Sequence, residues 1–269
     1  MAAGAKARRA AQSRWVEVAG RAGLVAKGGI YLVIGLLAIQ IPLGLGGQAA
    51  DRQGALRSLA REPYGKATIL ALAVGFAGYA LWRLVQAALD RDHEGTGAKG
   101  IAKRLVHFAK AVLYGASSVA AFALLAGASD GGSNERQDTA QVLALPLGRW
   151  LVAAAGAGFF AAGLYNAYRS VTGKFRDHLR ENELGKTARG WAIAVGVVGH
   201  AARGVVFALI GAFLLKAAAQ FDAKEAVGLD GALLKVAEQP YGPLLLGLVA
   251  AGLVAYALYC GVQARYRDV

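Results

Sequence analysis

The sequence has one cysteine, Cys260, among its 269 residues. A single cysteine excludes an intrachain disulfide and a cysteine-based metal cluster. Acidic side chains are scarce as well: Asp and Glu number 17 against 30 Lys and Arg, and none lies inside a long apolar run. The chain also contains no H-E-x-x-H metalloprotease motif and no P-loop. These absences predict that the protein is not an enzyme and that it carries no metal and no cofactor.

The hydrophobic residues, in contrast, are abundant and occur in blocks. They make up 56% of the chain, and the mean hydropathy is +0.41. Most of the uncharged runs approach or exceed the roughly 18–20 residues that cross a bilayer as a helix. They cover residues 28–50, 67–82, 111–129, 150–168, 204–215 and 244–264. The sequence therefore predicts an all-α, polytopic integral membrane protein with six transmembrane helices.

The net charge of +13 does not indicate a nucleic-acid partner, because Lys and Arg concentrate on alternate connections between the runs. With both termini taken as cytoplasmic, the connections on that side hold 17 of these residues and the outer connections hold 9. Positively charged loops are typical of the cytoplasmic side. The distribution predicts a multi-pass membrane protein with both termini in the cytoplasm.

One pattern occurs three times. A cation is followed 36 or 37 residues later by a proline, in the pairs Lys27 with Pro63, Lys110 with Pro146, and Arg203 with Pro240. A glycine follows each proline by twelve residues and an aromatic residue follows by nineteen. The pattern predicts hairpin repeats at 15–92, 98–173 and 191–269, with a basic N-terminal segment at 1–14 and a charged cytoplasmic linker at 174–190. Each repeat holds two spans, so the copies share one orientation.

The repeats also predict local features. Each proline is expected to open the second span, because its missing N–H costs nothing in the first turn of a helix. A short amphipathic helix is expected before Pro63 and Pro240, whereas the polar, glycine-rich residues 130–138 predict a mobile loop. Small residues at Gly75, Gly158 and Gly252 are expected to allow close helix packing.

Six aromatic residues are expected to form an interfacial belt, which is where Tyr and Trp are enriched in membrane proteins. They are Tyr31, Tyr114, Phe207, Trp82, Tyr165 and Tyr259.

The repeated cations Lys27, Lys110 and Arg203 are the first candidates for a binding site. An ionisable residue inside a span is a functional candidate by default, and three such residues at one depth could hold an anion. The simpler interpretation is that each side chain reaches the headgroup region, where lipid phosphates supply the counter-charge.

His107 and His200 each precede a repeated cation by three residues and so share its helical face. They could relay protons, although an interfacial imidazole bonded to backbone or lipid is the simpler explanation. Two histidines without Cys or carboxylate partners are too few for a metal site.

The threefold pattern resembles a bacterial membrane family known as domain of unknown function 1206. The resemblance rests on Lys27-Gly28 and Arg203-Gly204, on the Gly-Ala-Leu stretch before the proline, and on the Pro-Tyr-Gly phrase. It covers nearly the whole chain after about residue 15, and it implies a six-span inner-membrane protein without implying an activity.

The leading functional hypothesis is a non-enzymatic structural or binding module. Its expected partners are the anionic headgroups of membrane lipids, with a membrane-protein partner or a homo-oligomer as a further possibility. The alternative is a secondary transporter or channel for a small anion that uses the repeated cations.

Overall fold

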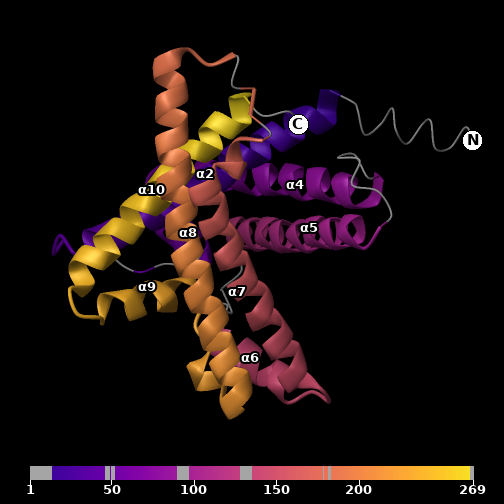
Figure 1. The fold of residues 1–269 in the computed structure, drawn as a ribbon, viewed down its shortest axis with the longest axis vertical. Coiled ribbons are helices and arrows are strands. Elements are labelled where there is room, and N and C mark those ends of the chain that lie inside the picture. The colour runs from indigo at the N-terminus through magenta and orange to yellow at the C-terminus, as the bar shows by residue number, and fades with distance from the viewer. Residues whose placement is uncertain are drawn as a thin grey trace, which may run out of the picture. The chain divides into compact units, whose positions relative to one another are not determined.

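The computed structural model describes residues 14–45, 49, 52–89, 97–127, 135–177, 179–180 and 183–266. Across these residues the chain is helical and no β-strand is present (Figure 1). Six helices are long and apolar enough to cross a membrane, which confirms the predicted fold class. They are α2 (Arg14–Gln40), α4 (Gly65–Leu89), α5 (Ala98–Leu125), α7 (Gly148–Thr172), α8 (Lys186–Gln220) and α10 (Gly242–Tyr266).

A short helix precedes the second span of every repeat. These helices are α3 (Arg52–Ala60), α6 (Glu135–Leu143) and α9 (Leu229–Ala237), each nine residues long. The expected mobile loop at 130–138 is therefore wrong from Glu135 onward, and residues 130–134 lie outside those described. The middle copy forms a helix because Leu143 packs with Val152 of α7 and Ala218 of α8. This tertiary contact outweighs the polar composition of the segment.

The second span begins two residues after the proline, at a glycine, and not at the proline itself. The amide of that glycine donates to a carbonyl three residues earlier in each copy: Gly65 to Glu62, Gly148 to Leu145, and Gly242 to Gln239. An added Cβ on any of the three glycines would collide with a backbone carbonyl near the end of the preceding short helix. The proline thus lies in a tight turn, and the glycine allows the two helices to meet.

The chain divides into two compact units. One contains Met1–Gly29, Ser58–Ser129 and Cys260–Val269, and the other contains Ile30–Arg57 and Asp130–Tyr259. In the first unit α4 and α5 run side by side, and in the second α7 and α8 do so (Figure 1). Each pair joins the second span of one repeat to the first span of the next. Contacts between α10 and α2 join the last repeat to the first in the same way.

These inter-repeat contacts share one register. In each pair, the residue eight positions after the repeated cation lies on the first span of a repeat. It faces a backbone carbonyl on the second span of the preceding repeat, ten positions after the proline. Ser118 donates to the carbonyl of Ala73 over 2.8 Å. A Cβ on Gly35 would lie 3.0 Å from the Ala250 carbonyl, and one on Gly211 would lie 2.7 Å from that of Gly156. Small residues at this position therefore bring the helix backbones close together, as they do in many membrane helix pairs.

A polar contact closes the other end of each pair. Arg104 donates to the carbonyls of Ala87 and Ala88 at the C-terminus of α4. Arg21, six residues before Lys27 as Arg104 is before Lys110, donates to the equivalent carbonyls of Ala264 and Arg265 in α10. A cation suits this place because the last carbonyls of a helix lack intrahelical partners and carry partial negative charge.

In the third pair, formed by α7 and α8, the hydrogen-bond donor and acceptor have changed helices. Val197 of α8 stands at the position that Arg21 and Arg104 occupy in the other two pairs. Its carbonyl accepts a hydrogen bond of 2.8 Å from Ser170, which lies 24 residues after Pro146. A hydrogen bond therefore links the two helices at the same register, with a serine as the donor instead of an arginine.

Within the first and third repeats, the predicted small-residue packing is present. A Cβ on Gly75 would collide with the Ala26 side chain, and one on Gly252 would collide with the equivalent Ala202. The middle repeat differs, because a Cβ on Gly158 would meet no atom within 4 Å among the described residues. In that copy the close packing of α7 instead involves Gly156 and Gly163, which face the backbone of α8.

Candidate functional site

Two of the three repeated cations lie against a tyrosine of their own repeat. Lys27 is 8% exposed, and its Nζ lies 5.9 Å from the centroid of the Tyr79 ring. Arg203 donates from Nη1 to the hydroxyl of Tyr256 over 2.6 Å. Each tyrosine follows its proline by sixteen residues, whereas the middle repeat has Ala162 at that position. Lys110 of the middle repeat is half-buried.

The Arg203 cluster consists of Arg203, Tyr31, Phe207 and Tyr256. The guanidinium carbon lies 4.3 Å from the Tyr256 ring centroid, 4.6 Å from that of Phe207 and 5.4 Å from that of Tyr31. Tyr31 and Tyr256 also meet edge to face, with centroids 5.0 Å apart. A guanidinium over aromatic faces is attracted by the ring quadrupole, the more so where water is excluded. The cation is thus held by α8, α10 and α2 together.

The Arg83 cluster consists of Lys27, Tyr79, Trp82, Arg83 and Gln86. Arg83 is 5% exposed and lies 4.4 Å from the ring centroid of Trp82 and 4.9 Å from that of Tyr79. It donates to the Gln86 side-chain oxygen over 2.8 Å and to the Tyr79 hydroxyl over 2.7 Å. Lys27 and Arg83 therefore share the Tyr79 ring, and every hydrogen-bond acceptor of Arg83 among the described residues is neutral.

His200 belongs to an aromatic cluster beside Arg203. The side chain is 1% exposed, and its Nδ1 lies 2.8 Å from the carbonyl oxygen of Gly196. Its ring stacks on Phe175 with centroids 5.1 Å apart, and Tyr256 packs against its edge. A backbone carbonyl and aromatic rings therefore surround the imidazole. His107 is half-buried on α5, in the other unit.

Among the residues that the structure describes, no group of three His, Cys, Asp or Glu side chains could hold a metal ion.

Comparison with known families decides the relationship that the repeats suggested. The model of the family described as Domain of Unknown Function (DUF1206) matches this chain three times, at residues 22–90, 105–173 and 191–267. The chain belongs to this family. One match falls in each hairpin repeat, so the triplication is confirmed, while the boundaries of the repeats stay a prediction.

A curated relative carries no activity in its name. This DUF1206 protein is 33% identical over 255 residues to the Uncharacterized protein YxxB of Bacillus subtilis (strain 168). The match covers 95% of this chain and 92% of the relative. No solved structure matches. Function must therefore be inferred from the residues themselves.

The expected aromatic belt is largely wrong. Trp82 and Tyr259 are 0% exposed, and Tyr31 and Tyr114 are 4% exposed, because their rings fill helix contacts. Tyr114, for example, packs on both Phe76 and Tyr79. Periodicity along one helix shows which residues share a face, but it does not show whether lipid or another helix covers that face.

Tyr165, in the middle repeat, fits the belt better. It is 57% exposed near the end of α7, and Tyr168 is 46% exposed one turn later. Lys174 lies over the Tyr168 ring, 4.9 Å from its centroid. A hydrogen bond with Tyr168 raises the pKa of Lys174 above its ordinary value. This pair is typical of a membrane interface, where amphipathic rings and cations meet the headgroups.

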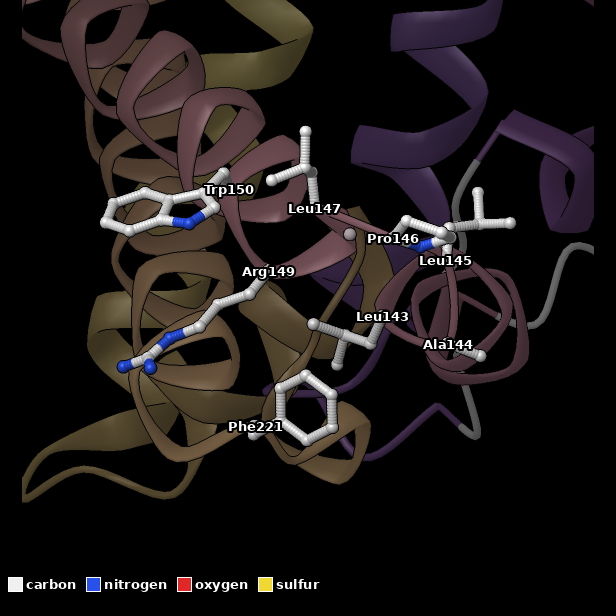
Figure 2. Close-up of a pocket in the computed structure, with 9 residues that line it drawn as sticks. Leu143, Ala144, Leu145, Pro146, Leu147, Arg149, Trp150 and Phe221 are labelled. Carbon is white, nitrogen blue, oxygen red and sulfur yellow. The ribbon is translucent and has the colours of Figure 1, made fainter.

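An open groove of about 690 Å³ lies at the opposite end of α7 (Figure 2). Its walls are mainly apolar and include Leu147, Trp150 and Phe221. The one charged side chain in its lining, Arg149, already donates to the carbonyls of Ala218 and Ala219 at the C-terminus of α8. The lining of the groove is thus mainly apolar, and its one guanidinium is engaged by the end of α8.

One literal match to a catalytic string occurs in the chain. Residues 127–131 read G-A-S-D-G, which fits the G-x-S-x-G pattern of serine hydrolases. In those enzymes the serine sits on a turn from a strand into a helix. Here Gly127 follows the end of the helix α5, and residues 128–131 lie outside those described. The string thus lacks the preceding strand that the serine-hydrolase motif requires.

Sequence reasoning missed two features of these clusters. It did not select Tyr79 and Tyr256, although their common spacing from the proline was a usable signal. It also did not select Arg83, because the residue has no charged equivalent in the other repeats. Only the folded structure shows that Arg83 and Lys27 meet at one ring.

Proposed function

We propose that this DUF1206 protein is a non-enzymatic membrane module that binds anionic lipid headgroups at its basic, cytoplasmic end. The observation that carries the proposal is the chemistry of the Arg83 cluster. Lys27 and Arg83 are both more than nine-tenths buried and share one tyrosine ring, and Arg83 contacts a phenol, an indole and an amide among the described residues. None of these groups is an anion.

The cost of burying charge supports this proposal. A buried cation is expensive unless a counter-charge or good hydrogen bonds compensate it. Cation–π contacts supply about 0.5–2 kcal/mol each and leave the net positive charge in place. In a membrane, the nearest abundant anions are lipid phosphates, and basic pockets between helices are known places for such headgroups.

The alternative of an anion transporter is not favoured by any contact described above. The guanidinium of Arg203 contacts three aromatic rings and donates to the hydroxyl of one of them, Tyr256. These contacts give Arg203 a role in stabilising the fold. Transport stays a prediction from the sequence, and it enters below as one outcome of the experiment.

Native mass spectrometry tests the lipid proposal. The purified protein is compared with a Lys27→Met, Lys110→Met double variant in mixed micelles of phosphatidylglycerol and phosphatidylcholine. Methionine keeps the length of the stem, so the comparison isolates the charge. We expect the wild type to retain phosphatidylglycerol selectively and the variant to lose most of that selectivity.

The matched control is the Lys66→Met, Lys235→Met variant, which removes the same charge from the outer connections. Lys66 is exposed, and Lys235 is already paired with Glu238 at 2.7 Å. The control should keep the selectivity. Equal lipid retention in all three proteins would refute the proposal, and anion flux through liposomes containing the wild type would then favour transport.

A further inference from the structure

The three repeats provide an internal comparison for Arg83. The residue lies twenty positions after its proline, where the middle repeat has Asn166 and the last repeat has Cys260. Both of these neutral residues are buried, Asn166 at 7% and Cys260 at 0% exposure. Asn166 bonds to the carbonyl of Ala162 in its own helix. The fold therefore accepts a small neutral residue here, and the packing of the repeat does not require a cation.

The guanidinium of Arg83 has donors without a hydrogen-bond partner among the described residues. It has five N–H donors. One goes to Gln86 and one to Tyr79, while the buried Nε has no hydrogen-bond partner among the described residues. A buried donor without a partner carries a desolvation cost, which an oxygen-rich ligand would remove.

The cluster has the elements of a phosphate site. Guanidinium groups bind phosphate through two parallel hydrogen bonds, and a neighbouring ammonium adds a compact positive charge. Tyr79 contacts both cations, since its ring centroid is 4.9 Å from the Arg83 guanidinium carbon and 5.9 Å from Lys27 Nζ. Arg83 is six residues from the end of α4 at Leu89, or about 9 Å along the helix axis.

We propose that Arg83 and Lys27 together bind one phosphate group, entering from the C-terminal end of α4. The proposal rests on the proposed lipid-binding function and narrows it to a single site and ligand group. The ligand atoms are the oxygens of a phosphate group, which either the headgroup of an anionic phospholipid or free inorganic phosphate can supply.

The proposal is tested with an Arg83→Asn variant. The Lys103→Asn variant provides its charge-matched control, because Lys103 is an exposed cation near the start of α5.

Trp82 provides a local signal, because its ring lies 4.4 Å from the Arg83 guanidinium carbon. The experiment records tryptophan emission of the detergent-solubilised full chain during titration with three probes. These are inorganic phosphate, short-chain phosphatidylglycerol and short-chain phosphatidylcholine. A Trp82→Phe variant identifies the part of the signal that comes from this site.

We expect a saturable change that Trp82→Phe abolishes, and Arg83→Asn should weaken binding by about tenfold or more. Lys103→Asn should bind like the wild type. A response to phosphatidylglycerol alone identifies a lipid headgroup as the source, and a response to inorganic phosphate as well identifies the phosphate group as sufficient. A response to phosphatidylcholine of equal affinity would contradict the need for net negative charge.

Two results would overturn the site. One is a wild-type titration without saturable change for either anionic probe, and the other is unchanged binding in Arg83→Asn. If Arg83→Asn does not fold, Arg83→Lys keeps the charge and loses the planar fork, and it should still weaken binding. The Lys27→Met, Lys110→Met variant could lose lipid selectivity while the emission of Trp82 does not change in the wild-type titration. That result would support lipid binding and contradict this site.

Discussion

Replacing Gly211 by alanine is expected to unfold the α7–α8 pair at a markedly lower temperature. A Cβ at Gly211 would collide with the backbone nitrogen of Phe160 and lie 2.7 Å from the carbonyl oxygen of Gly156. Both neighbours are main-chain atoms, so no side chain can rotate away and the two helices must separate. Overpacking of this kind costs about 1–3 kcal/mol, and we expect the upper end of the range. The measurement is thermal unfolding in detergent followed by size-exclusion chromatography.

The control for this variant is Gly190→Ala in the same helix. An added Cβ at Gly190 would meet no described atom within 4 Å. Alanine is also the better helix former by up to about 1 kcal/mol, so the control should be neutral or slightly stabilising. Equal stability of the two variants would show that the backbones of α7 and α8 are not in close contact at Gly211.

The second large effect is expected at the contact between Arg203 and Tyr256. Tyr256→Phe removes the acceptor of a 2.6 Å hydrogen bond from a cation and keeps the ring. The loss should cost about 1–3 kcal/mol, because the partner left behind is charged and partly buried. Arg203→Met should cost more, because three cation–π contacts disappear together with the hydrogen bond.

A double-mutant cycle separates this interaction from the general effect of each change. If Arg203 and Tyr256 act as a pair, the double variant should be more stable than the sum of the single losses predicts, by about 1 kcal/mol or more. Additive losses would mean that the two residues stabilise the fold independently. Thermal unfolding of the four proteins in one detergent provides the comparison.

The sequence was sufficient to predict the repeats and the number of spans. Long uncharged runs have one stable solution in a bilayer, because a helix satisfies its own backbone hydrogen bonds. The nearly equal spacing of Lys27, Lys110 and Arg203 from their prolines, 36 or 37 residues, then showed that one unit occurs three times. The short helices before Pro63 and Pro240 followed from their apolar spacing.

The contacts between repeats could not be predicted in this way. Small residues indicate that a helix face allows close approach, but they do not name the helix that approaches. Gly75 packs on its own repeat, whereas Gly156, Gly163 and Gly211 form the contact between α7 and α8. The role of Arg83 was hidden for the same reason, since its environment is made by side chains on its own helix and by Lys27 on another.

The local corrections have physical causes that lie outside a single helix. The proline was expected to open the second span because it suits the first helical turn. In the folded chain, the preceding short helix ends so close by that only glycine fits at the true start, as at Gly242. The helix α6 likewise depends on contacts with Val152 of the next helix and with Ala218, which is distant in sequence.

The central claim is that buried cations at the basic end of this DUF1206 protein are compensated by anionic headgroups. Its most direct test is an electron cryo-microscopy map of the full chain, bound to an antibody fragment, in nanodiscs of phosphatidylglycerol and phosphatidylcholine. We predict headgroup density within hydrogen-bonding distance of Arg83 and Lys27. An ordered cluster with only its own side chains around these cations, while lipid density lies elsewhere on the protein, would contradict the account.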